Sequence, residues 1–353
     1  MNSSLAATLE SLDDIALAIL TTLIASQHLI IRAPASTLSS LDSDISRIAS
    51  FTFSFTCASI TCTSSTTVND FSEAIILDSS ARRDNDELDL DTRRIANIVV
   101  ARDLDLASED VQIQALEVMR QRRALSHTAL HAAPNNFLFI ALLSNAPPTY
   151  NTENNSRPTP TSRGLIKHLN DHFFISHVHD PDTSDSSSLL STTSSSNDTA
   201  SISSATGSQT SILIHSPPTS TDPPPISPST IATLQQSLAT IRTTAEIRRY
   251  AHDILTYLRL HRCVAGGVSA IAARHLDALA RVLALLHGLD YVTPALVQLA
   301  ARKVLRHRVV LATAATERSV QWGSARGAVR AALVGVEAGE VVEDVLGTVP
   351  CPL

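Results

Sequence analysis

The sequence predicts an α/β domain with a buried parallel sheet, followed by an all-helical domain. Short apolar runs alternate with helical patterns in the first 180 residues, which is typical of a parallel sheet covered by helices. Beyond residue 230 only helical periodicity remains. The 353 residues are 44% hydrophobic, which is enough to fill a sizeable core.

Three apolar runs, at 29–31, 95–101 and 137–143, are the predicted strands. The second is apolar at nearly every position, as expected of a strand that is buried on both faces. Helices are predicted over 5–25, 38–48 and 108–123, and Ser108 is the expected N-cap of the last. Pro34 ends the first strand.

Residues 181–230 are rich in Ser, Thr, Asp and Pro and have few apolar side chains to bury, so they are predicted to be a disordered linker. Helices follow over 231–241, 245–260, 270–286 and 294–312. Gly288 is expected to end the third, and Thr293 followed by Pro294 to begin the fourth. We therefore divide the chain into an α/β core (1–180), a linker (181–230) and a helical domain with a C-terminal extension (231–353).

The net charge of -7 and the pI near 6.0 disfavour a nucleic-acid binder, because phosphate neutralisation requires excess Lys and Arg. Bases nevertheless outnumber acids between Arg242 and Arg330, with Arg308 among them. This basic helical face is interpreted as a solvated surface or as a contact with the acidic N-terminal domain. Trp322 is expected to be a core side chain or a docking anchor.

The four cysteines form neither a CxxC pair nor a disulfide framework, which favours a reducing compartment, the cytoplasm or alternatively the nucleus. Cys57 and Cys62 resemble half of a metal site, but no second half follows. The apolar run at 15–31 is preceded by acids and interrupted near Gln27, so no membrane segment is predicted.

Two motifs in the helical half carry a family resemblance. Residues 287–297 (HGLDYVTPALV) and 304–309 (VLRHRV) resemble the lid helices of magnesium-chelatase subunit I and MoxR-type AAA+ ATPases. Residues 259–269 and 317–324 are similar to fungal magnesium-chelatase-like proteins, and 96–119 resembles the family's Walker-B strand and following helix. The resemblance implies a P-loop NTPase (AAA+)-like three-layer domain with a helical lid, a nucleotide between the two, and ring-shaped or hetero-oligomeric assembly.

Within this resemblance, residues 32–39 (RAPASTLS) stand where the phosphate-binding loop is expected. Such a loop needs glycines for close backbone approach and a Lys on the β- and γ-phosphates. Pro34 and Ser39 match the family's Pro and magnesium-binding hydroxyl, but the glycines are absent and the Lys position is Leu38. The simpler alternative is that Pro34 ends a strand and Ser39 caps a helix.

The acidic positions after the second strand have also changed. By the same resemblance the magnesium-orienting Asp corresponds to Arg102 and the water-activating Glu to Asp103, which is one methylene shorter. Asp103 is the catalytic candidate. The alternative is that Asp103 and Asp105 are solvated loop acids.

Three further positions follow from the resemblance. The polar sensor corresponds to Ser144, or to Asn145 if the register shifts by one. The arginine finger corresponds to His172, and the lid's sensor arginine to Ile271. Pro34, Ser39 and Ser144 are thus the candidate cofactor-binding residues of an altered nucleotide site.

His168, His172, His177 and His179, with Asp180, have side chains of the kind that zinc prefers. The first two fall on a predicted helix and the others on an extended segment, so nothing in their spacing makes them converge. We predict no metal site.

The resulting interpretation is a protein-interaction or regulatory module with a degenerate nucleotide site and no efficient ATP hydrolysis, acting on protein partners away from membranes. One alternative is an active ATPase of magnesium-chelatase type that uses ATP and Mg²⁺ for metal insertion into a porphyrin or for protein remodelling, although no residue supports the porphyrin chemistry itself. A second is a nucleic-acid-associated factor that uses the basic lid.

Overall fold

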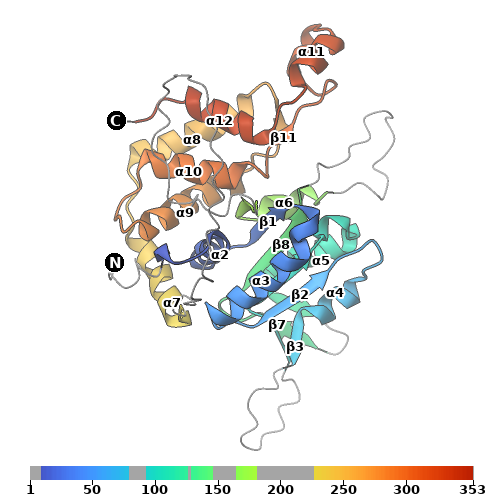
Figure 1. Ribbon diagram of the computed structural model, residues 1–353. Coiled ribbons are helices and arrows are strands. Elements are labelled where there is room, and N and C mark those ends of the chain that lie inside the picture. The colour runs from blue at the N-terminus through green and yellow to red at the C-terminus, as the bar shows by residue number, and fades with distance from the viewer. Residues whose placement is uncertain (1–8, 79–92, 126–128, 146–163, 181–225, 353) are drawn as a thin grey trace, which may run out of the picture.

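The computed structural model describes residues 9–78, 93–125, 129–145, 164–180 and 226–352. An α/β domain and a helical domain lie side by side, with the N-terminal helix α2 between them (Figure 1). Residues 181–225, most of the predicted linker, lie outside the described residues. None of the helices in the described part combines the length and apolar character needed to cross a bilayer.

The α/β domain contains a five-stranded sheet with the order β2-β5-β8-β1-β9, in which every neighbouring pair is parallel. The seven residues of β8 are all buried, as expected for a central strand that helices cover on both faces. The strands are β1 (Leu29–Ala33), β2 (Cys57–Thr61), β5 (Ile98–Arg102), β8 (Leu138–Ser144) and β9 (Ile175–Val178).

Alternate residues of β1 belong to two different cores. Leu29 and Ile31 pack with α2 (Asp14–Ala25) and α3 (Leu38–Phe51), whereas Ile30 packs with α4 (Val68–Ala74) and α5 (Glu109–Gln121). This two-residue alternation is the geometry of a strand between two helical layers. The three-layer α/β fold predicted from the sequence is confirmed, and Ser108 caps α5 by accepting the N–H of Val111.

Two short antiparallel hairpins and a short helix complete this domain. The predicted strand at 95–101 is two strands, because the N–H of Asn97 donates to the Thr56 hydroxyl at 3.1 Å and interrupts the pairing. The elements are β3 (Ile76–Asp78) with β4 (Arg93–Ile95), β6 (Arg123–Leu125) with β7 (Leu130–Ala132), and α6 (Lys167–His172).

Side-chain caps stabilise the starts of four helices in the helical domain. Ser227, Thr244, Ser269 and Thr293 each accept a backbone N–H in the first turn of the helix that follows. The helices are α7 (Pro228–Ser237), α8 (Ala245–Leu260), α9 (Ala270–Leu286), α10 (Pro294–Leu305), α11 (Arg326–Leu333) and α12 (Ala338–Thr348), with 3-10 turns at Leu238–Thr240 and Arg318–Trp322.

Two predicted boundaries in this domain need correction. The helix predicted over 294–312 ends at Leu305, because Val310 and Leu311 form β11, which pairs with β10 (Val264–Gly266). The first helix begins at Pro228, earlier than the predicted 231. The predicted bounds of α8 and α9 are confirmed, and Gly288 follows α9 with a φ of +71°.

The two domains share one hydrophobic core. Ile19 of α2, Ile175 of β9 and Leu279 of α9 belong to the same cluster of buried side chains. Contacts of α2 with α9 and of β9 with α10 close the junction. The helical domain therefore packs directly on the N-terminal helix and on one edge of the sheet.

Candidate functional site

The sequence places its candidate residues at the carboxyl ends of neighbouring parallel strands. Strand β1 lies between β8 and β9, and the chain leaves β1 for the far edge strand β2, so the strand order reverses beside β1. Ligands of open α/β sheets bind at such a switch point, outside the carboxyl ends of the strands. Ala33 pairs with Ser144, and Arg102 pairs with Leu142, which brings three candidate segments to this edge.

The turn after β1 is short and bonded to itself. Four residues, 34–37, separate the strand from α3, and Ala35–Thr37 form a 3-10 turn. Both the N–H and the hydroxyl of Thr37 donate to the Pro34 carbonyl at 3.0 Å. No residue of this turn has the positive φ that glycines supply in a phosphate-binding loop. Pro34 therefore follows the end of the strand, as the simpler interpretation predicts, but Ser39 does not cap the helix, because it lies inside α3, whose N-cap is Thr37.

Leu38, which stands at the position of the phosphate-binding Lys, is a core residue. Its side chain is 5% exposed and packs in the same cluster as Leu41 and Ile45, the apolar face of α3. The first turn of α3 thus presents an apolar side chain to the interior at this position.

Replacing Leu38 by Lys is expected to destabilise the protein by about 2 to 4 kcal/mol, because an ammonium group would enter an apolar core without a partner. Urea unfolding of Leu38→Lys measures this. The control is Ser43→Lys on the exposed side of the same helix, which should stay within about 0.5 kcal/mol of wild type. Equal stability of both variants would mean that residue 38 faces solvent.

Arg102 occupies the space beside the Ser39 hydroxyl. Its Nη1 donates to Ser39 Oγ at 3.1 Å, and its Nε lies 4.0 Å from Asp103 Oδ2. The side chain is 24% exposed. A guanidinium keeps its proton at any ordinary pH, so this edge of the sheet has a fixed positive charge between α3 and β5.

Asp103 adopts a left-handed backbone conformation, with φ +53°, and its N–H donates to the Leu142 carbonyl at 2.9 Å. Asp tolerates this region better than most residues. A 3-10 turn, Leu104–Leu106, follows. The pKa of the nearby Cys62 thiol is raised to about 12, chiefly by burial and then by the negative charges of Asp103 and Asp105. The Asp103 carboxylate thus lies between Arg102 and a buried thiol.

The remaining candidate positions lie in two places. Ser144 is buried at the end of β8, and the N–H of Asn145 donates to the Ala33 carbonyl at 2.9 Å. His172 ends α6, and its ring lies 5.9 Å from that of His28. Ile271 lies in the first turn of α9. His172 and Ile271 are therefore near the junction of the two domains, away from Arg102.

The histidines of the 168–180 segment do not converge. His168 is exposed on α6, whereas His177 is buried in β9, where burial lowers its pKa to about 3. In the part of the chain that the structure describes, no group of three or more His, Cys, Asp or Glu side chains is placed to hold a metal ion.

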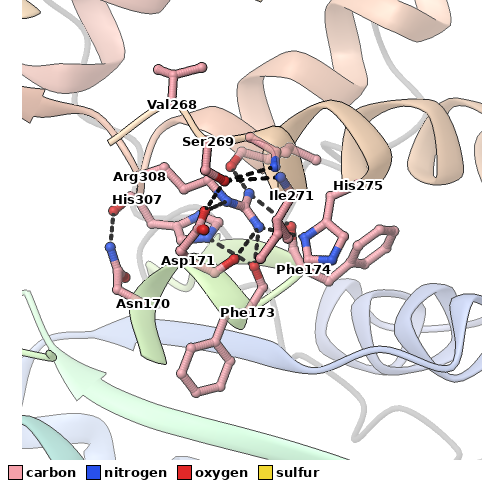
Figure 2. Close-up of polar contacts among 12 residues, drawn as sticks. Asn170, Asp171, Phe173, Phe174, Val268, Ser269, Ile271, His275, His307 and Arg308 are labelled. Carbon is pink, nitrogen blue, oxygen red and sulfur yellow. Dashed lines mark hydrogen bonds and ion pairs between the residues drawn. The ribbon is translucent and has the colours of Figure 1, made fainter. Parts of the chain in front are cut away.

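The sequence analysis missed a buried polar cluster at the domain junction. Arg308, one of the bases counted on the lid, is fully buried and pairs with Asp171 of the N-terminal domain, so for this residue the solvated surface is wrong and the predicted contact with that domain is found (Figure 2). His275 lies against it, also buried. Arg306 and His307 precede Arg308 directly, so its neighbours in the sequence carry no signal of its burial.

Two other bases of the lid pair with nearby acids, and Trp322 faces solvent. Arg302 pairs with Glu343 at 2.6 Å and Arg262 with Glu317 at 3.0 Å. Both pairs are internal to the lid. Trp322 is 88% exposed, so a core position for it is wrong, and a docking role remains a prediction.

Comparisons with known proteins agree with this architecture. The family model for the AAA lid domain matches residues 256–323. The crystal structure of a candidate ATPase from Cytophaga hutchinsonii superposes with a TM-score of 0.60 at 14% identity, covering 95% of this chain and 88% of that one. A full-length MCM homolog from Methanopyrus kandleri gives a TM-score of 0.44 at 13% identity, covering 87% of this chain and 59% of that one.

A search of curated proteins found no match. The similarity to the Cytophaga hutchinsonii protein, at 14% identity, shows the fold alone. Together with the parallel sheet and the matched lid, it establishes that the chain has an α/β P-loop NTPase fold followed by an AAA-type helical lid.

Proposed function

We propose that this protein is a magnesium-chelatase-like and MoxR-like AAA+ module that binds partner proteins and does not hydrolyse ATP. The observation that carries the proposal is the hydrogen bond from Arg102 Nη1 to Ser39 Oγ at 3.1 Å. By the family resemblance these two positions hold a magnesium ion together. In this chain a guanidinium lies between them instead.

Electrostatics supports the loss of catalysis. Mg²⁺ requires near-ideal octahedral coordination by oxygens, and a guanidinium has only donors and no lone pair to offer as a ligand. Arg102 would repel the ion, and Leu38, buried in the core, offers no charge to the terminal phosphates. The residues at this edge therefore do not fit a magnesium nucleotide.

The exposed apolar side chains of the lid support a binding role. Trp322, Leu260 and Val334 are all exposed, and large apolar residues on a surface are characteristic of interaction sites. Proteins, including further copies or a related subunit in a ring, are the proposed partners. Nucleic acid is not favoured, since Arg302 and Arg262 are paired with acids of the lid itself.

The proposal predicts no ATP turnover. Enzymes commonly turn over at about 10 per second, and this chain is expected to remain at least about a thousandfold below that rate. Phosphate release from the purified full chain and isothermal titration with Mg-ATP measure turnover and binding. Arg102→Ala is the diagnostic variant, and it should stay equally inactive because Leu38 and the closed turn remain.

An active ATPase would give a different result. Turnover at an ordinary motor rate, with micromolar binding of Mg-ATP and loss of activity in Asp103→Ala, would contradict the proposal and favour the magnesium-chelatase-type ATPase. If activity survives in Asp103→Ala, a contaminating ATPase is the source.

A further inference from the structure

Buried and half-buried polar side chains connect the lid to the end of α6 and the residues just before β9 (Figure 2). We refer to them as the junction cluster. Two come from the α/β domain and four from the lid, from the start of α9, its second turn and the chain just after α10. The junction cluster consists of Asn170, Asp171, Ser269, His275, His307 and Arg308.

Arg308 is the centre of the cluster, with its side chain 0% exposed. Its Nη2 donates to the Asp171 carbonyl at 3.2 Å and to His275 Nδ1 at 2.6 Å, and its Nη1 donates to the Phe174 carbonyl at 3.3 Å. Its Nε lies 3.3 Å from Asp171 Oδ1, an ion-pair contact. The guanidinium also donates to the backbone carbonyls of Phe173 and Val304.

Asp171 links this charge to the beginning of α9. Its Oδ1 accepts the Ser269 hydroxyl at 2.8 Å, and Ser269 Oγ in turn accepts the N–H groups of Ile271 and Ala272, which caps the helix. One carboxylate of the α/β domain therefore contacts both a helix start and a buried cation of the lid. A charge-assisted pair with such partners is among the stronger polar interactions in proteins.

His307 and Asn170 add a second pair of bonds across the junction. Asn170 Nδ2 donates to the His307 carbonyl at 2.7 Å, and His307 Nε2 donates to the Phe173 carbonyl at 3.2 Å. These bonds run in opposite directions between the same two segments. Together they connect His307, just after α10, to Asn170 at the end of α6 and to Phe173 just before β9.

The charges of the cluster are compatible at neutral pH. Burial lowers the pKa of Arg308 to about 10, with Asp171 opposing the change, so the guanidinium stays protonated. Burial and the neighbouring Arg308 lower the pKa of His275 to about 3, so its Nδ1 keeps the lone pair that accepts the bond. The ion pair with Asp171 thus opposes the buried charge of Arg308, although Arg308 Nε and His307 Nδ1 are buried without a hydrogen-bond partner among the described residues.

The apolar contacts at the junction do not set the lid's orientation by themselves. Packing of α2 on α9 contributes free energy but little direction, because hydrophobic contact depends on buried area. Hydrogen bonds to buried charges are directional and costly to leave unmade, so they select one placement.

We propose that the junction cluster is a latch that holds the lid against the α/β domain without any nucleotide. By the family resemblance, His172 corresponds to the arginine finger and Ile271 to the lid's sensor arginine. Here they flank the latch, since Asp171 precedes His172 and Ser269 lies two residues before Ile271. The inference goes beyond the proposed function, because it concerns what fixes the lid and not what the protein binds.

Hydrogen exchange and solution scattering of the full chain test the latch. Arg308→Met should speed amide exchange in residues 170–174 and 269–272 at least tenfold, and should broaden the distance distribution from X-ray scattering. The matched control is Arg302→Met in α10, six residues earlier in the chain, whose ion pair with Glu343 is internal to the lid. It should leave both measurements at wild-type values, and Mg-ATP should change neither measurement in the wild type.

A variant with a milder change keeps the test decisive if Arg308→Met does not fold. Asn170→Ala removes one bond between the domains and should speed the same amides about threefold. Wild-type exchange and scattering in a folded Arg308→Met variant, or in Asn170→Ala, would overturn the latch. So would a lid movement on addition of Mg-ATP to the wild type, whereas ATP turnover without lid movement would overturn only the proposed function.

Discussion

Replacing Gly267 by Ala is expected to destabilise the protein by about 3 kcal/mol or more. Gly267 has a φ of +98°, and an added Cβ would lie 1.8 Å from the Arg308 carbonyl oxygen and 3.1 Å from the Val310 nitrogen. Both neighbours are backbone atoms, which cannot rotate away. The change would therefore push β10 away from the chain that carries Arg308.

Gly288→Ala is the matched control. Gly288 also has a positive φ, +71°, but no atom lies within 4 Å of its added Cβ. Only the backbone strain applies there, so the expected cost is about 1 kcal/mol. Urea unfolding of the two variants separates strain from steric overlap, and equal costs would contradict the close approach of Gly267 to Arg308.

Lowering the pH is expected to reduce the free energy of unfolding already at pH values well above those at which carboxylates titrate. Burial lowers the pKa of His28, His177 and His275 to about 3, and lowers that of His307 well below its usual range. Unfolded histidine has a pKa near 6.5, so the unfolded chain binds these protons first. Their contribution to stability is complete above about pH 6.5 and is lost as the pH falls from there toward 3.

His28 shows why the neutral form is needed. Its Nδ1 accepts the N–H of Phe139 at 3.1 Å, and its Nε2 donates to the Met119 carbonyl at 3.3 Å. A protonated ring would present a second donor to the Phe139 N–H. His28 thus joins the start of β8 to α5 only while it is uncharged.

Urea titrations between pH 7 and 5 measure the effect. The free energy of unfolding should fall by roughly 1 kcal/mol per pH unit for each of these histidines once the pH is below 6.5. In His28→Gln the free energy of unfolding should depend less steeply on pH, by the contribution of one proton. This holds whatever the stability of the variant at pH 7. A flat profile over this range in the wild type would show that the histidines are not buried in neutral form.

Much of the fold could be predicted from the sequence, because local patterns specify it. The apolar runs that became β1 and β8 and the caps at Ser108 and Thr293 are short-range signals, and the structure confirms them. The end of α10 at Leu305 could not be predicted this way. The residues that follow are apolar and helix-compatible, and only their pairing with β10 takes them out of the helix.

The candidate nucleotide site remains a prediction that rests on a family resemblance. Leu38, Arg102 and Ser39 stand out in the sequence only beside the motifs of a resembling family, and their residue types alone indicate missing phosphate and magnesium ligands. The packing of α3 against β1 and β5 decides two features of this site. It turns Leu38 into the core, and it brings Arg102 within hydrogen-bond distance of Ser39. No sequence pattern gives the contact between residues 63 positions apart.

The sequence by itself determined an α/β domain and a helical lid, because periodicity and caps are local properties. Only the tertiary structure decided that Arg308 is buried at the junction and that His275 accepts its hydrogen bond. From any short stretch of sequence, an arginine is predicted to be a charged surface residue. Its burial becomes favourable only when Asp171 and the carbonyls of a distant segment surround it.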